Sequence, residues 1–160
     1  MSMTTTRIET LRAEEGELVF PAFGLTEVWR LGARIVERAM QAGFKITVDI
    51  RKPGAILFRA ALPGSTPDQQ FWVDGKSATA LRLERSTAVL EAEFGEMGFD
   101  PASIGWLPRE QYVLGGGSVP IRVSGVGVVA VATVSGLASD EDHDLVTECL
   151  RELLAEETTR

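Results

Sequence analysis

A β-hairpin that leads directly into a helix is the feature of this sequence that most constrains its fold. The segment 115–144 opens with three consecutive glycines, alternates through 118–123 and turns at Ser124-Gly125. A longer β-branched run, 126–134, follows before the chain breaks at Ser135-Gly136 and a helical pattern begins. Because glycine and serine at these places are typical of turns, the segment predicts two paired strands and a helix start.

The two strands of this hairpin are expected at different places in the sheet. In the first strand Val119, Ile121 and Val123 alternate with other residues and face inward, while Pro120 cannot donate a ladder hydrogen bond. The first strand is therefore expected at an edge, at least where it begins. The run 126–134 is apolar on both faces, which is typical of a central strand covered above and below.

Upstream, the same reasoning predicts a second hairpin and several helices. Lys45–Arg51 alternates, and Pro53-Gly54 turns the chain into the run 55–62. Helical spacing of apolar residues predicts helices over residues 4–14, 26–42, 66–83, 86–97 and 140–156. The segment 98–112 is the least regular, with one helical turn expected at Asp100-Pro101, and with Trp106 and Leu107 expected to cover the core.

The helix over 66–83 has its own start signature. Thr66 precedes Pro67, and Gln69 lies three residues after Thr66. A Thr-x-x-Gln pattern predicts a capping box, and proline is favoured at the first helical position.

A short apolar run, Leu18-Val19-Phe20, stops at Pro21 and supplies a first strand. The order strand, helix, hairpin, helices, hairpin, helix predicts an α+β fold with a largely antiparallel sheet. A chain of 160 residues, 44% of them hydrophobic, is long enough for one domain with a proper core. We expect an N-terminal helix or extension over residues 1–16 and a single domain over 17–160.

Composition narrows the classes of function. The formal net charge of −7, without a basic block, argues against nucleic-acid binding through phosphate contacts. No apolar run approaches the roughly 20 residues that cross a membrane, and no signal-peptide pattern is evident, so a cytoplasmic protein is expected. Cys149 is the only cysteine, which excludes an intrachain disulfide, and it is expected as a small core residue of the last helix.

Several stretches resemble a known family when taken in order. They are 48–51, 58–68, Trp72 with the run 76–80, 116–123, 134–136 and 141–143. Together they resemble the haem-degrading domain superfamily of GlcG-like and HbpS-like proteins, in its branch of small UPF proteins. The resemblance implies a profilin-like fold, an antiparallel sheet of about five strands flanked by helices, assembly into homo-oligomers, and haem or a related tetrapyrrole as the ligand.

His143 is the candidate metal ligand. It lies in the first turn of the last helix at the border of the apolar stripe, where a neutral imidazole could coordinate haem iron or another metal. The helix N-terminus favours the neutral ring and the surrounding carboxylates favour the cation, so its charge stays open. The alternative is a packing or capping histidine.

Four further residues are candidate ligand-binding positions. Lys76 shares a helical stripe with apolar residues, so a half-buried stem is expected, and its ammonium could pair with a carboxylate, phosphate or propionate. The alternative is a lysine paired to a local acid, Asp74 or Glu84. Arg122 could hold an anion or be an exposed strand arginine. Gly116 and Gly117 could let backbone amides approach a ligand or serve only as a flexible strand entry.

These residues predict a homo-oligomeric small-ligand-binding protein, with its pocket between the glycine-rich loop, the Lys76 helix and the start of the last helix. Trp29 and Trp106 could stack on a tetrapyrrole or lie in the core or an interface. One alternative is an enzyme acting on a small organic acid, with Lys76 or Arg122 holding the carboxylate and His143 moving a proton. That alternative requires all three side chains in one pocket. A non-catalytic, partner-binding scaffold is the other.

Overall fold

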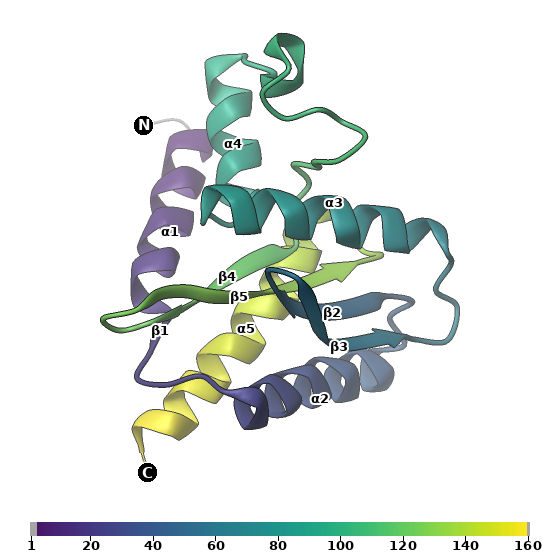
Figure 1. Ribbon diagram of the computed structural model, residues 1–160, viewed down its shortest axis with the longest axis vertical. Helices are drawn as coiled ribbons and strands as arrows, with labels where there is room; N and C mark the ends of the chain where they lie inside the picture. Colours follow the sequence, from purple (N-terminus) through teal and green to yellow (C-terminus); the bar gives the residue numbers. More distant parts are fainter. Residues whose placement is uncertain (1–2, 160) are drawn as a thin grey trace.

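A five-stranded sheet forms the middle of the molecule (Figure 1). We describe residues 3–159 from a computed structural model. The strands are β1 (Val19–Phe20), β2 (Thr47–Lys52), β3 (Ala55–Ala61), β4 (Ser118–Val123) and β5 (Gly127–Ser135), in the spatial order β1-β4-β5-β2-β3. All neighbours pair antiparallel except β1 and β4, which are parallel. Both predicted hairpins and the central place of β5 are confirmed.

Helices cover both faces of this sheet (Figure 1). On one face lie α2 (Leu25–Ala42) and α5 (Ser139–Thr158), and on the other lies α3 (Asp68–Leu83), followed by α4 (Thr87–Met97). The short 3-10 helix η1 (Pro101–Ile104) confirms the helical turn expected there. The α+β class is therefore confirmed. None of the helices in residues 3–159 is long and apolar enough to cross a membrane.

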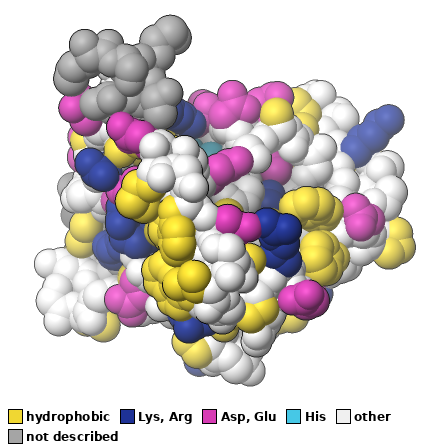
Figure 2. Space-filling model, turned by 90° about the horizontal axis from the view of Figure 1, so that it is seen from above, with side chains coloured by type: hydrophobic (Ala, Val, Ile, Leu, Met, Phe, Trp, Pro, Cys, Tyr) yellow, Lys and Arg dark blue, Asp and Glu magenta, His cyan; other side chains and the backbone are white. Residues whose placement is uncertain are grey.

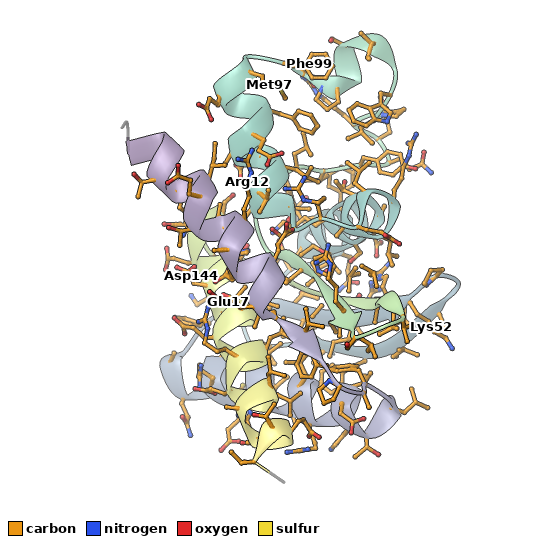
Figure 3. All side chains as sticks on the ribbon, turned by 90° about the vertical axis from the view of Figure 1, so that its left-hand side faces the viewer. Arg12, Glu17, Lys52, Met97, Phe99 and Asp144 are labelled. Carbon is orange, nitrogen blue, oxygen red and sulfur yellow. The ribbon has the colours of Figure 1, made fainter. Side chains whose placement is uncertain are left out.

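The first helix, α1 (Met3–Glu17), packs along α4 at the side of the molecule (Figure 3). Its Leu11 is buried against Ala88 and Val89 of α4. Arg12, labelled in Figure 3, donates to Glu93 of α4 at 2.8 Å. The helix thus docks on its own chain. The predicted boundary between residues 1–16 and a domain over 17–160 stays a prediction.

The apolar core lies between the sheet and the pair α2 and α5. Alternation along the strands directs one set of side chains to this face, because successive strand residues point to opposite sides. The central members, all fully buried, are Leu31, Ile35, Ile46, Val48, Ile50, Ile121, Ala132, Val134, Val146, Cys149, Leu150 and Leu153. Cys149 is confirmed as a core residue.

The opposite face of the sheet, beneath α3, carries buried hydroxyl groups. Ser77 of α3 hydrogen-bonds Thr133 of β5 at 2.9 Å, and Thr133 hydrogen-bonds Ser118 of β4 at 2.8 Å. The Ser118 backbone amide then donates to the Thr87 hydroxyl of α4 at 3.0 Å. All four residues are fully buried. We call these four residues the hydroxyl layer; it joins α3, the sheet and α4 through one connected network.

Two local predictions are corrected by tertiary contacts. The capping box of Thr66 is wrong: α3 begins after Pro67 without a side-chain cap, because the Gln69 amide instead donates to the Lys45 carbonyl and accepts from Thr47. Leu107 is buried as expected, but Trp106 keeps 38% of its surface exposed and packs on Phe94.

The position of Pro120 fits the expected edge. β1 pairs only with the last two residues of β4, so the outer side of β4 is uncovered at Pro120. A missing backbone donor at that point breaks no ladder hydrogen bond on the outer side.

Candidate functional site

Two adjoining clefts open between α3, the segment 98–117 and the start of α5. The larger, the apolar cleft, has a volume of about 590 Å³. The smaller, the polar cleft, has a volume of about 350 Å³. Trp72, Gly115 and Ser139 line both of them. Figure 2 views the molecule from the α4 end and shows hydrophobic side chains gathered on the surface beside charges of both signs.

Different chemistry lines each cleft. Aromatic and aliphatic side chains dominate the apolar cleft; they are Phe71, Trp72, Pro101, Ala102, Leu107, Tyr112, Val113 and Leu114. The polar cleft carries hydroxyl, amide and charged groups; they are Thr66, Asp68, Gln69, Lys76, Ser135, Ser139 and Asp142. A ligand that spans both clefts would therefore need one apolar and one polar end.

A buried ion pair forms one wall of the polar cleft. Lys76 of α3 donates to Asp142 of α5 at 3.0 Å and to the Val134 carbonyl of β5 at 3.1 Å. Lys76 is only 3% exposed, so the expectation of a half-buried lysine is wrong. The expected pairing with Asp74 or Glu84 is also wrong, because the partner is Asp142.

The environment of Asp142 opposes its ionisation. Burial raises the pKa of this carboxyl to about 6, although the Lys76 ammonium and the backbone amide of Leu137 both act to lower it. The Leu137 amide donates to the second carboxylate oxygen at 3.0 Å. The pair thus places a proton-exchanging carboxyl and an ammonium together at the cleft wall.

Gly117 lies against this pair and Gly116 lies against the start of α5, because neither glycine has a side chain. A Cβ at Gly117 would stand 2.9 Å from the Lys76 nitrogen and 2.5 Å from the Val134 carbonyl oxygen, and its φ of +131° also favours glycine. A Cβ at Gly116 would lie 2.5 Å from the carbonyl oxygen of Ser139. The glycines therefore allow the loop to pack closely on the pair.

His143 faces away from both clefts. The residue is 1% exposed, and its Nε2 lies 2.6 Å from Glu14 of α1, which also accepts from Arg151 at 3.1 Å. Burial alone would raise the pKa of Glu14, but the contacts with His143 and Arg151 outweigh it and lower that pKa. The His143 Nδ1 has no hydrogen-bond partner within the described residues.

Arg122 lies near His143 rather than near Lys76. Its guanidinium donates to the Glu84 carbonyl, and together with His143 it lines a space of only about 10 Å³. Lys76 and Gly117 are thus brought together, with Gly116 next in the chain against Ser139, whereas Arg122 and His143 lie elsewhere. The convergence of Lys76, Arg122 and His143 that the organic-acid enzyme requires is not found.

Metal-binding side chains are not clustered in the described residues. No group of three or more His, Cys, Asp or Glu there could hold a metal ion. Burial raises the pKa of the Cys149 thiol to about 11, so the thiolate is disfavoured at neutral pH. A metal ion bound by a single side chain would therefore need its other ligand atoms from a group such as a porphyrin.

Sequence reasoning missed most residues that line the apolar cleft. Trp29 and Trp106, the tryptophans considered for stacking, do not line it, whereas Trp72 does. Tyr112 was assigned only to the irregular segment, and that segment supplies most of one wall. Its irregularity was the available signal, because binding groups are often carried by loops on a rigid scaffold.

The family follows from a direct comparison. The profile of the family described as "Haem degrading protein HbpS-like" matches residues 23–151. The chain belongs to this family. A UPF0303 protein of Streptomyces avermitilis is 39% identical to this HbpS-like chain over 147 residues, covering 92% of the chain and 90% of the relative.

Solved structures extend the comparison of this HbpS-like chain. The Ybr137w protein superposes with a TM-score of 0.86 at 27% identity, covering 96% of this chain and 92% of that one. PduOC, solved as a complex with haem, gives a TM-score of 0.65 at 19% identity, covering 81% of this chain and 94% of that one. The second likeness shows a shared fold.

The residues of the clefts can be tested for their fit to haem. The apolar cleft lies within the range of about 300–1,000 Å³ typical of small-molecule sites and exposes aromatic faces. The polar cleft beside it offers donors to carboxylates. The space of about 10 Å³ beside His143 admits no macrocycle. The two clefts fit a tetrapyrrole, and the surroundings of His143 do not.

Proposed function

We propose that this HbpS-like chain is a cytoplasmic, homo-oligomeric binding protein for a planar amphipathic tetrapyrrole, with haem as the specific ligand. One observation carries the proposal: an aromatic-lined cleft of about 590 Å³ adjoins a polar cleft that contains a buried lysine. A tetrapyrrole has the matching chemistry, because its ring is apolar and its carboxylates are charged. The family match and the haem complex of PduOC support the same ligand class.

Aromatic residues would bind the apolar ring of the tetrapyrrole, and Lys76 would bind a carboxylate. Phe71 and Trp72, which are 48% and 42% exposed, would receive the apolar ring. Lys76 donates to two protein acceptors, so its ammonium retains a third N–H for a ligand carboxylate. Gly116 and Gly117 would hold the loop close enough for the carboxylate to reach it. Bound haem would supply iron for small-molecule coordination or electron transfer.

A titration with haemin tests this proposal. Trp72→Ala is expected to weaken haemin binding about threefold to tenfold, because it removes an aromatic contact from both clefts. Trp29→Ala is the matched control: Trp29 is 67% exposed on α2, across the sheet, and lines neither cleft. The Soret absorbance measures binding. The absence of saturable binding by the native protein, or equal losses in both variants, would reject the proposed cleft.

Assembly and location are separate parts of the proposal. Light scattering of the purified protein at micromolar concentration is expected to give a mass of several chains. A monomer across that range would contradict the homo-oligomer while leaving ligand binding to the haemin titration. The cytoplasmic location rests on the sequence prediction, and the ligand roles of Arg122 and His143 stay predictions.

A further inference from the structure

The apolar cleft contains one side chain suited to ferric iron whose donor atom is uncommitted. Tyr112 lines this cleft, and its hydroxyl makes no hydrogen bond within residues 3–159. The carboxylates there are engaged: Asp100 accepts from the Ala102 amide and Arg109, and Glu91 accepts from the Gly116 amide. His143 and Cys149 line neither cleft. Tyr112 therefore contributes to the apolar cleft a phenol oxygen without a protein partner among the described residues.

A cation lies over the ring of Tyr112. The Arg82 guanidinium carbon lies 5.0 Å from the ring centroid. A cation over an aromatic face is attracted by the negative face of the ring, so this contact fixes the position of the Tyr112 ring. Arg82 is itself fixed because it donates to the Trp106 carbonyl at 2.9 Å.

The backbone around Tyr112 is anchored to its own loop and to α3. Its amide donates to the Pro108 carbonyl at 2.9 Å. The next residue, Val113, donates to the Gly75 carbonyl at 3.1 Å and accepts from the Thr79 hydroxyl at 2.8 Å. These bonds fix the base of the tyrosine relative to the helix that carries Trp72. A preorganised donor of this kind is typical of a binding site held by a rigid scaffold.

We propose that Tyr112, rather than His143, is the iron ligand of haem in this protein. This inference rests on the proposed function. With ferric haem bound, the Tyr112 phenol would release its proton to solvent and its oxygen would serve as the protein donor to the iron, whose oxidation state would not change. The phenolate oxygen would complete a site whose ring-binding part is the aromatic wall of the apolar cleft.

Tyr112→Phe tests the inference because it removes only the hydroxyl, which has no protein partner to lose. The variant is expected to weaken haemin binding by about tenfold or more, since even outer groups of metal sites contribute that much. Its affinity for metal-free protoporphyrin IX should be unchanged, because that probe has no iron to coordinate. Resonance Raman spectra of the native haemin complex should contain phenolate–iron bands that the variant lacks.

Two further variants distinguish the possible outcomes. Tyr112→His is expected to restore tight haemin binding with a changed spin state, and His143→Ala to leave the native spectrum unchanged. Saturable native binding with identical spectra in Tyr112→Phe would overturn Tyr112 as ligand while the proposed function stands. Loss of the native spectrum only in a folded His143→Ala protein would assign the iron to His143. A native protein that binds no haemin rejects both proposals.

Discussion

Asp142→Asn is expected to lower the free energy of unfolding by about 3–5 kcal/mol at pH 7, because it leaves the buried Lys76 ammonium without a counter-ion. Asparagine keeps the size of the side chain and can still accept from the Leu137 amide, which donates to Asp142 at 3.0 Å. The loss therefore reports the charge of the pair rather than a missing backbone contact. Urea denaturation followed by circular dichroism measures it.

The reciprocal change separates the two charges. Lys76→Met is expected to cost less than Asp142→Asn, because Asp142, with a pKa already raised to about 6 by burial, can take up a proton and become neutral. The double variant, with Lys76→Met and Asp142→Asn, removes both charges and is expected to recover most of the stability. Additive losses in the double variant would contradict a coupled pair.

The pH dependence gives an independent check on Asp142. Its folded pKa of about 6 lies above its ordinary value of 3.8, so protonation favours the folded state. The stability it contributes is complete below the ordinary value and is lost as pH rises through about 6. The stability of the native protein relative to the double variant should therefore fall between those values. A difference that rises with pH would mean that the folded pKa is lowered.

Gly117→Ala is expected to lower the free energy of unfolding by about 2–5 kcal/mol, because it adds a backbone strain and a steric clash. The backbone at this glycine has a φ of +131°, and a Cβ would stand 2.5 Å from the Val134 carbonyl oxygen. The same Cβ would stand 2.9 Å from the Lys76 nitrogen. Thermal or urea unfolding measures the loss.

Gly127→Ala is the matched control for this change. Gly127 also has a positive φ, +107°, but no heavy atom outside its chain neighbours lies within 4 Å of a Cβ built there. It should therefore show only the backbone cost, about 1–3 kcal/mol. Equal losses at the two glycines would mean that the loop moves aside and that close packing on Lys76 adds nothing.

The predictable part of this fold was encoded locally. Alternation along 118–123 and 126–134 and helical spacing over 140–156 predicted a hairpin followed by a helix, because each pattern is complete within a few residues. The capping box at Thr66 failed for the opposite reason. Its Gln69 amide is held by Thr47 of β2 and by the carbonyl of Lys45, two residues before that strand, and these contacts have no counterpart in the local sequence.

The site was less predictable because its partners are far apart in the chain. Lys76 and Asp142 are separated by 66 residues, and His143 and Glu14 by 129. The sequence placed Lys76, Gly116 and Gly117 in one region, and the structure places Gly117 directly against Lys76 and Gly116 against Ser139. It could not show that His143 turns toward α1, because that depends on how a mostly polar helix packs against α4 and α5.

The hydroxyl layer has a consequence for how this protein can change over evolutionary time. Ser77, Thr87, Ser118 and Thr133 satisfy one another, so an apolar replacement of any one would strand a buried polar neighbour. Replacement of this layer by an apolar interface would therefore require either single substitutions that lower the stability of the fold or simultaneous substitutions at several positions. We therefore expect substitutions to accumulate faster in the irregular segment that supplies Tyr112 than in the hydroxyl layer beneath α3. The ligand preference could then change while the hydroxyl layer stays the same.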